Sequence, residues 1–219
     1  MWKETLQQIL QHLRVPNADA MIEEYRAAYS QPHRRYHNLE HVNYLLTALT
    51  SVPQPSPALL MAAMYHFFFY DAASDDNEKR SADYLRAKLQ AAGVNAAFTD
   101  AVIAIMLAPV NSVDMSFASL EAQHLADADM SIYGEAPEVY ARYVAAVREE
   151  FGNIGDFAWY QTRTRFLLSL LKQTRIYHTE EFYSKYEKHT RSNIATELIT
   201  MIDSYERTIL RQGQPAGVA

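Results

Sequence analysis

Two histidines stand four residues apart in the segment RRYHNLEHV, residues 34–42. On a helix, His37 and His41 would lie on one face, because residues four apart are neighbours on a helix surface. That spacing can bring two imidazoles to one metal ion. The alternative is a histidine near a helix start followed by one packed histidine, and for an isolated pair this alternative is favoured.

A third histidine lies in the segment HFFFYD, residues 66–71. His66 belongs to a mostly apolar stretch, so its ring must be hydrogen-bonded or bound to a metal, because an unpaired buried polar group is costly. Asp71 is expected near the end of the same helix. The alternative, favoured when this segment is considered by itself, is a hydrogen-bonded core histidine with Asp71 in a surface loop.

Carboxylates gather in the next segment, DAASDDNEKRSA, residues 71–82. As structural residues, Asp75 or Asp76 would cap a helix, and Glu78 would complement the dipole of its first turn. As a functional residue, one of these carboxylates would be a general acid or base beside a metal-bound water. Both interpretations stay open at this point.

Two aspartates, Asp127 and Asp129, lie in the segment DADMSIYG, residues 127–134. On a helix their side chains point about 200° apart, so only one of them can face a given site. A buried aspartate needs a cation, a metal or several N–H donors as its partner. Taken in order, the motifs present His, His and Asp on three separate helices. Such a set suits Zn²⁺, Mn²⁺, Fe²⁺ or Ni²⁺, with open positions for water and phosphate.

The elements that must hold these residues are all predicted to be helices. No segment alternates as a strand would, and apolar residues recur at helical spacing. The predicted helices cover residues 2–13, 21–29, 39–49, 59–69, 77–92, 98–106, 117–132, 136–151, 157–174 and 191–211. We expect an all-α fold of about ten helices in a single compact domain, residues 1–219. The proline cluster at residues 53–57 is expected to be a tight loop between helices.

Composition narrows the classes of function. The net charge is −6 and the pI is near 5.7, which argues against nucleic acid as a partner. Cysteine is absent, which excludes disulfides, cysteine-ligated zinc and thiol nucleophiles. No run of about 18 apolar residues predicts a membrane span, and the N-terminus lacks the apolar run of a signal peptide. We therefore expect a soluble cytoplasmic protein without a membrane partner, and a homodimer remains open.

In this order the motifs resemble those of the HD superfamily of metal-dependent phosphohydrolases. They are most similar to a bacterial subfamily whose members open with RxYHNxxH. The resemblance covers roughly residues 20–200 and rests on RRYHNLEHV, AAMYHFFFYD, DNEKRSA, DADMSIYG, YARYVAAVREEF and RIYHT. It implies a helical HD-type domain that hydrolyses a small phosphorylated molecule or nucleotide with a divalent metal (Zn, Mn, Fe, Ni or Mg).

The resemblance also implies roles for individual residues. The implied metal ligands are His41, His66 and Asp129. Asp127 is the second choice for the last of these ligands. The carboxylates implied near the reactive water are Asp71 and Glu78. The side chains implied to bind the substrate are Arg34, His37 and Lys79.

One residue departs from the family pattern. The residue after His66 should be a metal-binding aspartate, and it is Phe67, which cannot ligate a metal. The segment IAIMLAPVN, residues 103–111, also lacks the polar residues and histidine that relatives tend to have there. We therefore expect weakened activity and a weakly bound or absent metal. One alternative is a catalytically inactive protein of the same fold that binds a small phosphorylated ligand or a protein partner. Another is a helical domain without such a pocket, whose histidines are all structural.

The ring of Phe67 has two expected arrangements. It could fill the former metal space and pack on Met106 or Leu107, which would require hydrogen bonds for His41 and His66. It could instead swing away and leave the ligands around a water or a weakly held ion. We favour the first arrangement, because apolar changes in two segments indicate joint repacking.

Overall fold

Helices account for all of the regular secondary structure in the part of the chain that the computed structural model describes. These residues are 1–108 and 119–212, with side chains described as far as residue 203. The helices are α1 Trp2–His12, α2 Ala18–Tyr29, α3 Leu39–Ala48, η1 Leu49–Ser51, α4 Pro57–Tyr65, α5 Asn77–Ala91, α6 Ala96–Met106, α7 Leu120–Met130, η2 Ser131–Gly134, α8 Pro137–Glu150, α9 Asp156–Leu171 and α10 Glu180–Gln212. No strand occurs in these residues, which confirms the all-α prediction.

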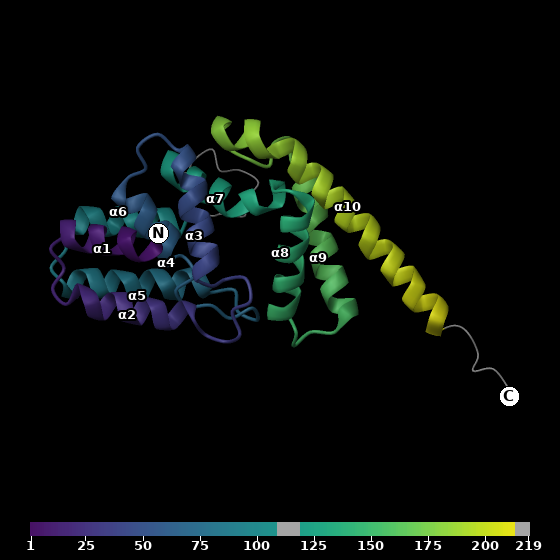
Figure 1. Ribbon diagram of the computed structural model, residues 1–219, viewed down its shortest axis with the longest axis horizontal. Helices are drawn as coiled ribbons and strands as arrows, with labels where there is room; N and C mark the ends of the chain where they lie inside the picture. The colour runs from purple at the N-terminus through teal and green to yellow at the C-terminus, as the bar shows by residue number, and fades with distance from the viewer. Residues whose placement is uncertain (109–118, 213–219) are drawn as a thin grey trace.

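The short apolar helix α4 forms the centre of the N-terminal helices. Its neighbours are α1, α3, α5, α6 and α7 (Figure 1). A helix that is apolar on every side is stable when it is covered on every side, and most of its residues, from Ala58 to Tyr65, are buried. Helices α8 and α9 lie beside this group, and α10 runs away from it toward the C-terminus (Figure 1). No helix in the described residues is both long and apolar enough to cross a membrane.

Helix α4 ends earlier than the apolar run predicts. The sequence predicts a helix over residues 59–69, but the helix ends at Tyr65. The carbonyl of Met64 accepts hydrogen bonds from the hydroxyls of Tyr25, at 2.9 Å, and Tyr29, at 2.6 Å. The last carbonyls of a helix need donors from outside the helix. Here, donors on α2 supply these bonds, so the chain need not continue as a helix.

Arg34 supplies the donors for the turn that follows α4. Its guanidinium donates to the carbonyls of Phe67 at 2.8 Å, Phe68 at 2.7 Å and His37 at 3.0 Å. The side chain is only 4% exposed and lies over the ring of Tyr29. The three consecutive phenylalanines, residues 67–69, do not predict this polar arrangement. The hydrogen bonds go to backbone carbonyls, which every residue type carries.

The next residues are held by α5. The backbone N–H of Phe69 donates to Ser81 Oγ at 2.9 Å, and Asp71 exchanges two hydrogen bonds with the side chain of Asn77. Asn77 and Ser81 are buried at the start of α5. The segment between α4 and α5 is therefore an ordered loop. Asp71 lies in this loop and not at the end of a helix, which is the second of its two expected positions.

The last helix begins earlier than the sequence predicts. Periodicity places its start near residue 191, whereas α10 begins at Glu180. Its first turns bury Phe182 and Tyr186, which are four residues apart and lie on the side that faces the protein. The charged residues between them mask this pattern in the sequence. The other predicted helices that lie within the described residues agree with the observed ones to within a few positions.

Replacing Arg34 by methionine should destabilise the fold strongly. The variant would leave buried carbonyls without donors, and each such group costs about 1–3 kcal/mol. We expect the free energy of unfolding, measured by urea denaturation, to fall by about 3 kcal/mol or more. The matched control is Arg35→Met, because the Arg35 side chain is 59% exposed and, among the described residues, its ion pair is with exposed Glu149. Equal stability of the two variants would contradict this account of the α4 terminus.

Candidate metal centre

Three helices bring His41, His66 and Asp129 to one point. His41 lies in the first turn of α3, which Asn38 caps by accepting from the N–H groups of Glu40 and His41. His66 is the C-cap residue of α4, and Asp129 lies near the end of α7. One ligand atom from each of the three side chains lies within 4.8 Å of the others. This is the convergence that the order of the motifs predicts.

The hydrogen bonding of His66 fixes which of its nitrogens faces this point. Its Nδ1 lies 2.8 Å from the carbonyl of Ala63, which can only accept, so Nδ1 carries the proton. Its Nε2 is therefore the nitrogen that faces the cluster, 3.8 Å from Asp129 Oδ1. A ring N–H held by a carbonyl with the other nitrogen free is the arrangement typical of a metal-ligating histidine.

Several buried polar atoms of the two histidines and of neighbouring Tyr36 are unpaired. Within the described residues, neither ring nitrogen of His41, nor Nε2 of His66, nor the hydroxyl of Tyr36 has a hydrogen-bond partner. His41 Nε2 lies 3.4 Å from Asp129 Oδ1, close enough for attraction but without a formed hydrogen bond. Leaving so many polar atoms unpaired is costly unless a ligand uses them.

The charge states of these residues suit metal binding. Burial lowers the pKa of His41 to about 3, although nearby Asp129 opposes the shift. Burial by itself would raise the pKa of Asp129, but His66 and His41 outweigh this and lower it to about 2. A neutral imidazole and an ionised carboxylate are the forms that ligate metals. Two imidazoles and one carboxylate fit a divalent ion such as Zn²⁺, Fe²⁺ or Mn²⁺ and leave positions for water.

A cleft of about 460 Å³ opens beside this cluster. Asp129 lies on its wall together with Asp71 and Glu78, the two carboxylates expected near the reactive water. Tyr36 lies on the same wall and packs its ring against His41, at 4.7 Å between ring centres. The loop between α4 and α5 and the first turn of α5 thus contribute carboxylates to the same cleft as Asp129.

Phe67 lies in the cleft wall and not between the ligands. Its ring contacts His66 at 4.4 Å, His37 at 4.9 Å and Tyr70 at 5.7 Å between ring centres. Ligand atoms that lie within 4.8 Å of one another leave no room for a phenyl ring between them. The arrangement favoured from the sequence, with the ring filling the metal space and the histidines hydrogen-bonded, is therefore wrong. The alternative, in which the ring leaves the ligand cluster intact, matches the structure.

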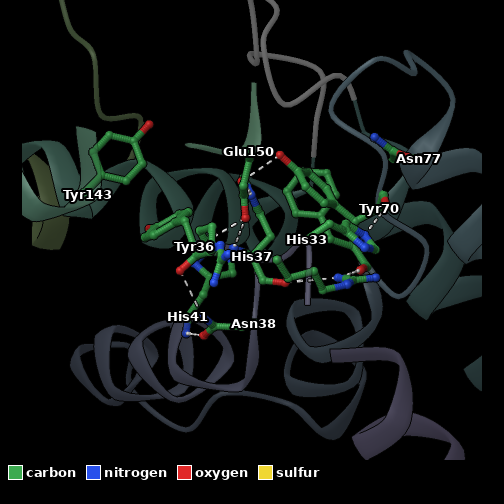
Figure 2. Close-up of polar contacts among 12 residues, drawn as sticks. His33, Tyr36, His37, Asn38, His41, Tyr70, Asn77, Tyr143 and Glu150 are labelled. Atoms are coloured by element: carbon green, nitrogen blue, oxygen red, sulfur yellow. Dashed lines mark hydrogen bonds and ion pairs between the residues drawn. The ribbon is translucent and has the colours of Figure 1, made fainter. Parts of the chain in front are cut away.

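His37 belongs to a second polar cluster and not to the ligand set. Its Nδ1 lies 2.7 Å from Glu150 Oε2, and the other oxygen of Glu150 accepts from the backbone N–H groups of Tyr36 and His37 (Figure 2). The hydroxyl of Tyr70 donates to the same carboxylate at 2.8 Å. His37 nevertheless lines the cleft, where its ring can contact a bound molecule.

Glu150 is the functional neighbour that sequence reasoning missed. It ends α8, far along the chain, yet its buried carboxylate joins the loop before α3 to the loop after α4. The only signal in the sequence is its place in YARYVAAVREEF, where Glu149 precedes it with the same chemistry. Nothing in that pattern tells which of the two carboxylates is buried.

Two residues expected to bind substrate lie elsewhere. Arg34 is buried and its guanidinium is committed to backbone carbonyls, so a phosphate-binding role does not fit its position. Lys79 is 70% exposed, pairs with Asp83 at 2.6 Å, and is not among the residues that line the cleft.

The second choice for the aspartate ligand, Asp127, also has another role. It accepts hydrogen bonds from the backbone N–H groups of His178 and Thr179 and from the Thr179 hydroxyl. These bonds anchor the start of α10 to α7. Because Asp127 and Asp129 point to different sides of one helix, the first serves the fold and the second faces the ligand cluster.

No family model, curated protein or solved structure matches this chain.

Replacing Glu150 by glutamine should change how stability depends on pH. Burial by itself would raise the pKa of Glu150, but His37 and the two backbone N–H groups lower it from about 4.5 to about 2. A lowered pKa in the folded state gives stability that is present above pH 4.5 and is lost as the pH falls toward 2. We expect the free energy of unfolding of the wild-type protein to exceed that of Glu150→Gln by about 3 kcal/mol at pH 7. This difference should shrink as the pH falls from 4.5 toward 2.

Urea denaturation at several pH values measures this gap. The control is Glu149→Gln, because the Glu149 side chain is 64% exposed. If the difference between wild type and Glu150→Gln stays constant as the pH falls, the carboxylate of Glu150 is not the stabilising form.

Proposed function

We propose that this protein is a metal-dependent phosphohydrolase of the HD type that acts on a small phosphorylated molecule or nucleotide. The observation that carries this proposal is the cluster of His41, His66 and Asp129, whose ligand atoms lie within 4.8 Å beside an open cleft. The unpaired nitrogens of the two histidines support a bound ion, because a purely structural cluster would hydrogen-bond them.

Each element of the cleft has a distinct task in this proposal. His41, His66 and Asp129 would hold the ion, which acidifies bound water and polarises a phosphoryl oxygen. Asp71 or Glu78, across the cleft, would accept a proton from the attacking water as general base. The ring of Tyr36 packs against His41, and among the described residues its buried hydroxyl has no hydrogen-bond partner.

A second candidate is a protein of the same fold that binds a phosphorylated ligand or a protein partner without turnover. The presence of Phe67 in the cleft wall favours it, because in the HD superfamily, which the motifs resemble, the residue at this position is a metal-binding aspartate. The two candidates differ in a measurable way. A hydrolase holds metal and turns over phosphomonoesters when loaded, whereas the binding protein turns over none.

Replacing His66 by alanine should abolish metal binding. Protein purified without chelator and dialysed against Zn²⁺ or Mn²⁺ is expected to hold about one ion per chain. His66→Ala should hold less than a tenth of that amount, because two ligands do not make a stable site. Elemental analysis and isothermal titration calorimetry measure the ion, and phosphatase assays on generic phosphomonoesters and nucleotides follow activity in parallel.

The matched control is His189→Ala, because His189 is an exposed histidine on α10. It should leave metal content unchanged. A wild-type protein that binds neither ion, or a His66→Ala variant that binds as well as the control, would sink the metal-centre assignment.

Replacing Phe67 by aspartate should strengthen the site. The side chain at this position contacts His66 and lines the same cleft as Asp129, so a carboxylate there would add a fourth, anionic ligand. We expect at least about tenfold tighter Zn²⁺ or Mn²⁺ binding and higher phosphatase activity, since each 1.4 kcal/mol of added affinity is a factor of ten. Unchanged affinity and activity would mean that the position no longer reaches the ion.

A further inference from the structure

The buried carboxylate of Glu150 joins two segments of the N-terminal half of the chain (Figure 2). One of its oxygens accepts from the backbone N–H groups of Tyr36, at 2.7 Å, and His37, at 2.9 Å. The other oxygen lies 2.7 Å from His37 Nδ1 and accepts from the Tyr70 hydroxyl at 2.8 Å. One side chain of α8 therefore holds residues 36–37 and residue 70 together.

These two segments flank the two histidine ligands in the sequence. Tyr36 and His37 come shortly before His41, and Tyr70 comes shortly after His66. His41 lies in the first turn of α3 and His66 is the C-cap residue of α4, so both ligands lie at helix ends. A helix end lacks part of the hydrogen bonds that hold the helix interior. The positions of both ligands consequently depend on the loops beside them, which Glu150 binds.

Ring contacts connect the same segments to the ligands. The ring of His37 meets the ring of His41 at 5.4 Å between ring centres. It also meets the ring of Phe67 at 4.9 Å, and Phe67 in turn contacts His66 at 4.4 Å. A displacement of His37 would therefore be felt by both ligands.

The geometry of the ligand cluster leaves little tolerance for such a displacement. Nε2 of His41 lies 3.4 Å, and Nε2 of His66 3.8 Å, from the same oxygen of Asp129. Ligating groups must stay within about 0.5 Å of the productive geometry. Loss of a partner that orients a ligand typically lowers metal affinity by about 10- to 100-fold.

We propose that Glu150 is a positioning residue of the metal centre, which holds both histidine-bearing segments from α8 and thereby sets the affinity for the ion. It acts through the backbone of residues 36–37 and through the Tyr70 hydroxyl, without ligating the ion itself. This inference rests on the proposed function for the presence of an ion. It makes α8 part of the metal centre although none of the three ligands lies on that helix.

Isothermal titration calorimetry of the full-length protein with Zn²⁺ tests this role. Glu150→Ala removes every bond of the carboxylate and should weaken Zn²⁺ binding at least about tenfold. Glu150→Gln keeps an oxygen that can accept from the N–H groups of residues 36 and 37, so its affinity should lie between those of Glu150→Ala and the wild type.

Tyr70→Phe removes one of these bonds and provides a milder second variant. It should weaken Zn²⁺ binding about threefold, as expected for the loss of one hydrogen bond. The double variant Glu150→Ala/Tyr70→Phe should bind Zn²⁺ no more weakly than Glu150→Ala, because both changes act through the same carboxylate.

Two controls separate positioning from loss of stability. Leu89→Ala creates a cavity at a buried position of α5, about 18 Å along the helix axis from its first residue, Asn77. It should lower the stability of the fold and leave Zn²⁺ affinity unchanged. Glu149→Gln, at an exposed neighbour of Glu150, should leave both unchanged. Circular dichroism shows that each variant is folded under the conditions of the titration.

The outcomes distinguish this inference from the proposed function. Equal Zn²⁺ affinity of Glu150→Ala and the wild type, or an equal loss in Leu89→Ala, would overturn the positioning role and leave the proposed function standing. A wild-type protein that binds no Zn²⁺ would overturn both. If Glu150→Ala binds Zn²⁺ more weakly as expected, but the loaded wild type hydrolyses no phosphomonoester or nucleotide, the positioning role stands and the proposed function is wrong.

Discussion

The donors that meet the C-terminus of α4 are the interaction on which the rest of the structure depends. A helix that ends inside a protein must find partners for its last carbonyls, or it leaves costly unpaired groups. Tyr25 and Tyr29 bond the carbonyl of Met64, and Arg34 bonds those of Phe67 and Phe68. These bonds connect α2 and the loop before α3 to the central helix. They also fix the direction in which the chain leaves it.

The same terminus prepares the candidate metal centre. His66 caps α4, and its Nδ1–H donates a hydrogen bond to the carbonyl of Ala63, one turn back in the same helix. That bond fixes the orientation of the imidazole, with Nε2 toward Asp129. Arg34 binds the carbonyl of His37 as well as those beyond α4, so one guanidinium sets the spacing between the two histidine-bearing segments. Fold stability and ligand geometry thus depend on the same hydrogen bonds.

A second buried charge connects the C-terminal helices to this arrangement. Glu150 at the end of α8 accepts from the backbone before α3, from His37 and from Tyr70 (Figure 2). Its single carboxylate therefore binds both the loop before α3 and the loop after α4, which border the cleft. The N-terminal helices carry the ligands, while α8 and α9 complete the wall that a bound molecule would contact. The wall of the cleft is consequently built from segments that are far apart in the sequence, residues 36–78 and residues 129–166.

The sequence by itself determined the helical class, most of the helix positions and the residues able to ligate a metal, because periodicity and side-chain chemistry are local properties. It also separated Asp127 from Asp129, since helix geometry sends neighbouring carboxylates to different sides. Tertiary structure decided the rest. Helix α4 stops at Tyr65 only because donors arrive from other elements, and Arg34 is structural only because those carbonyls are buried. Whether the carboxylate of Glu149 or Glu150 is buried, and where the ring of Phe67 lies, follow from packing between segments that are distant in sequence, which no local pattern records.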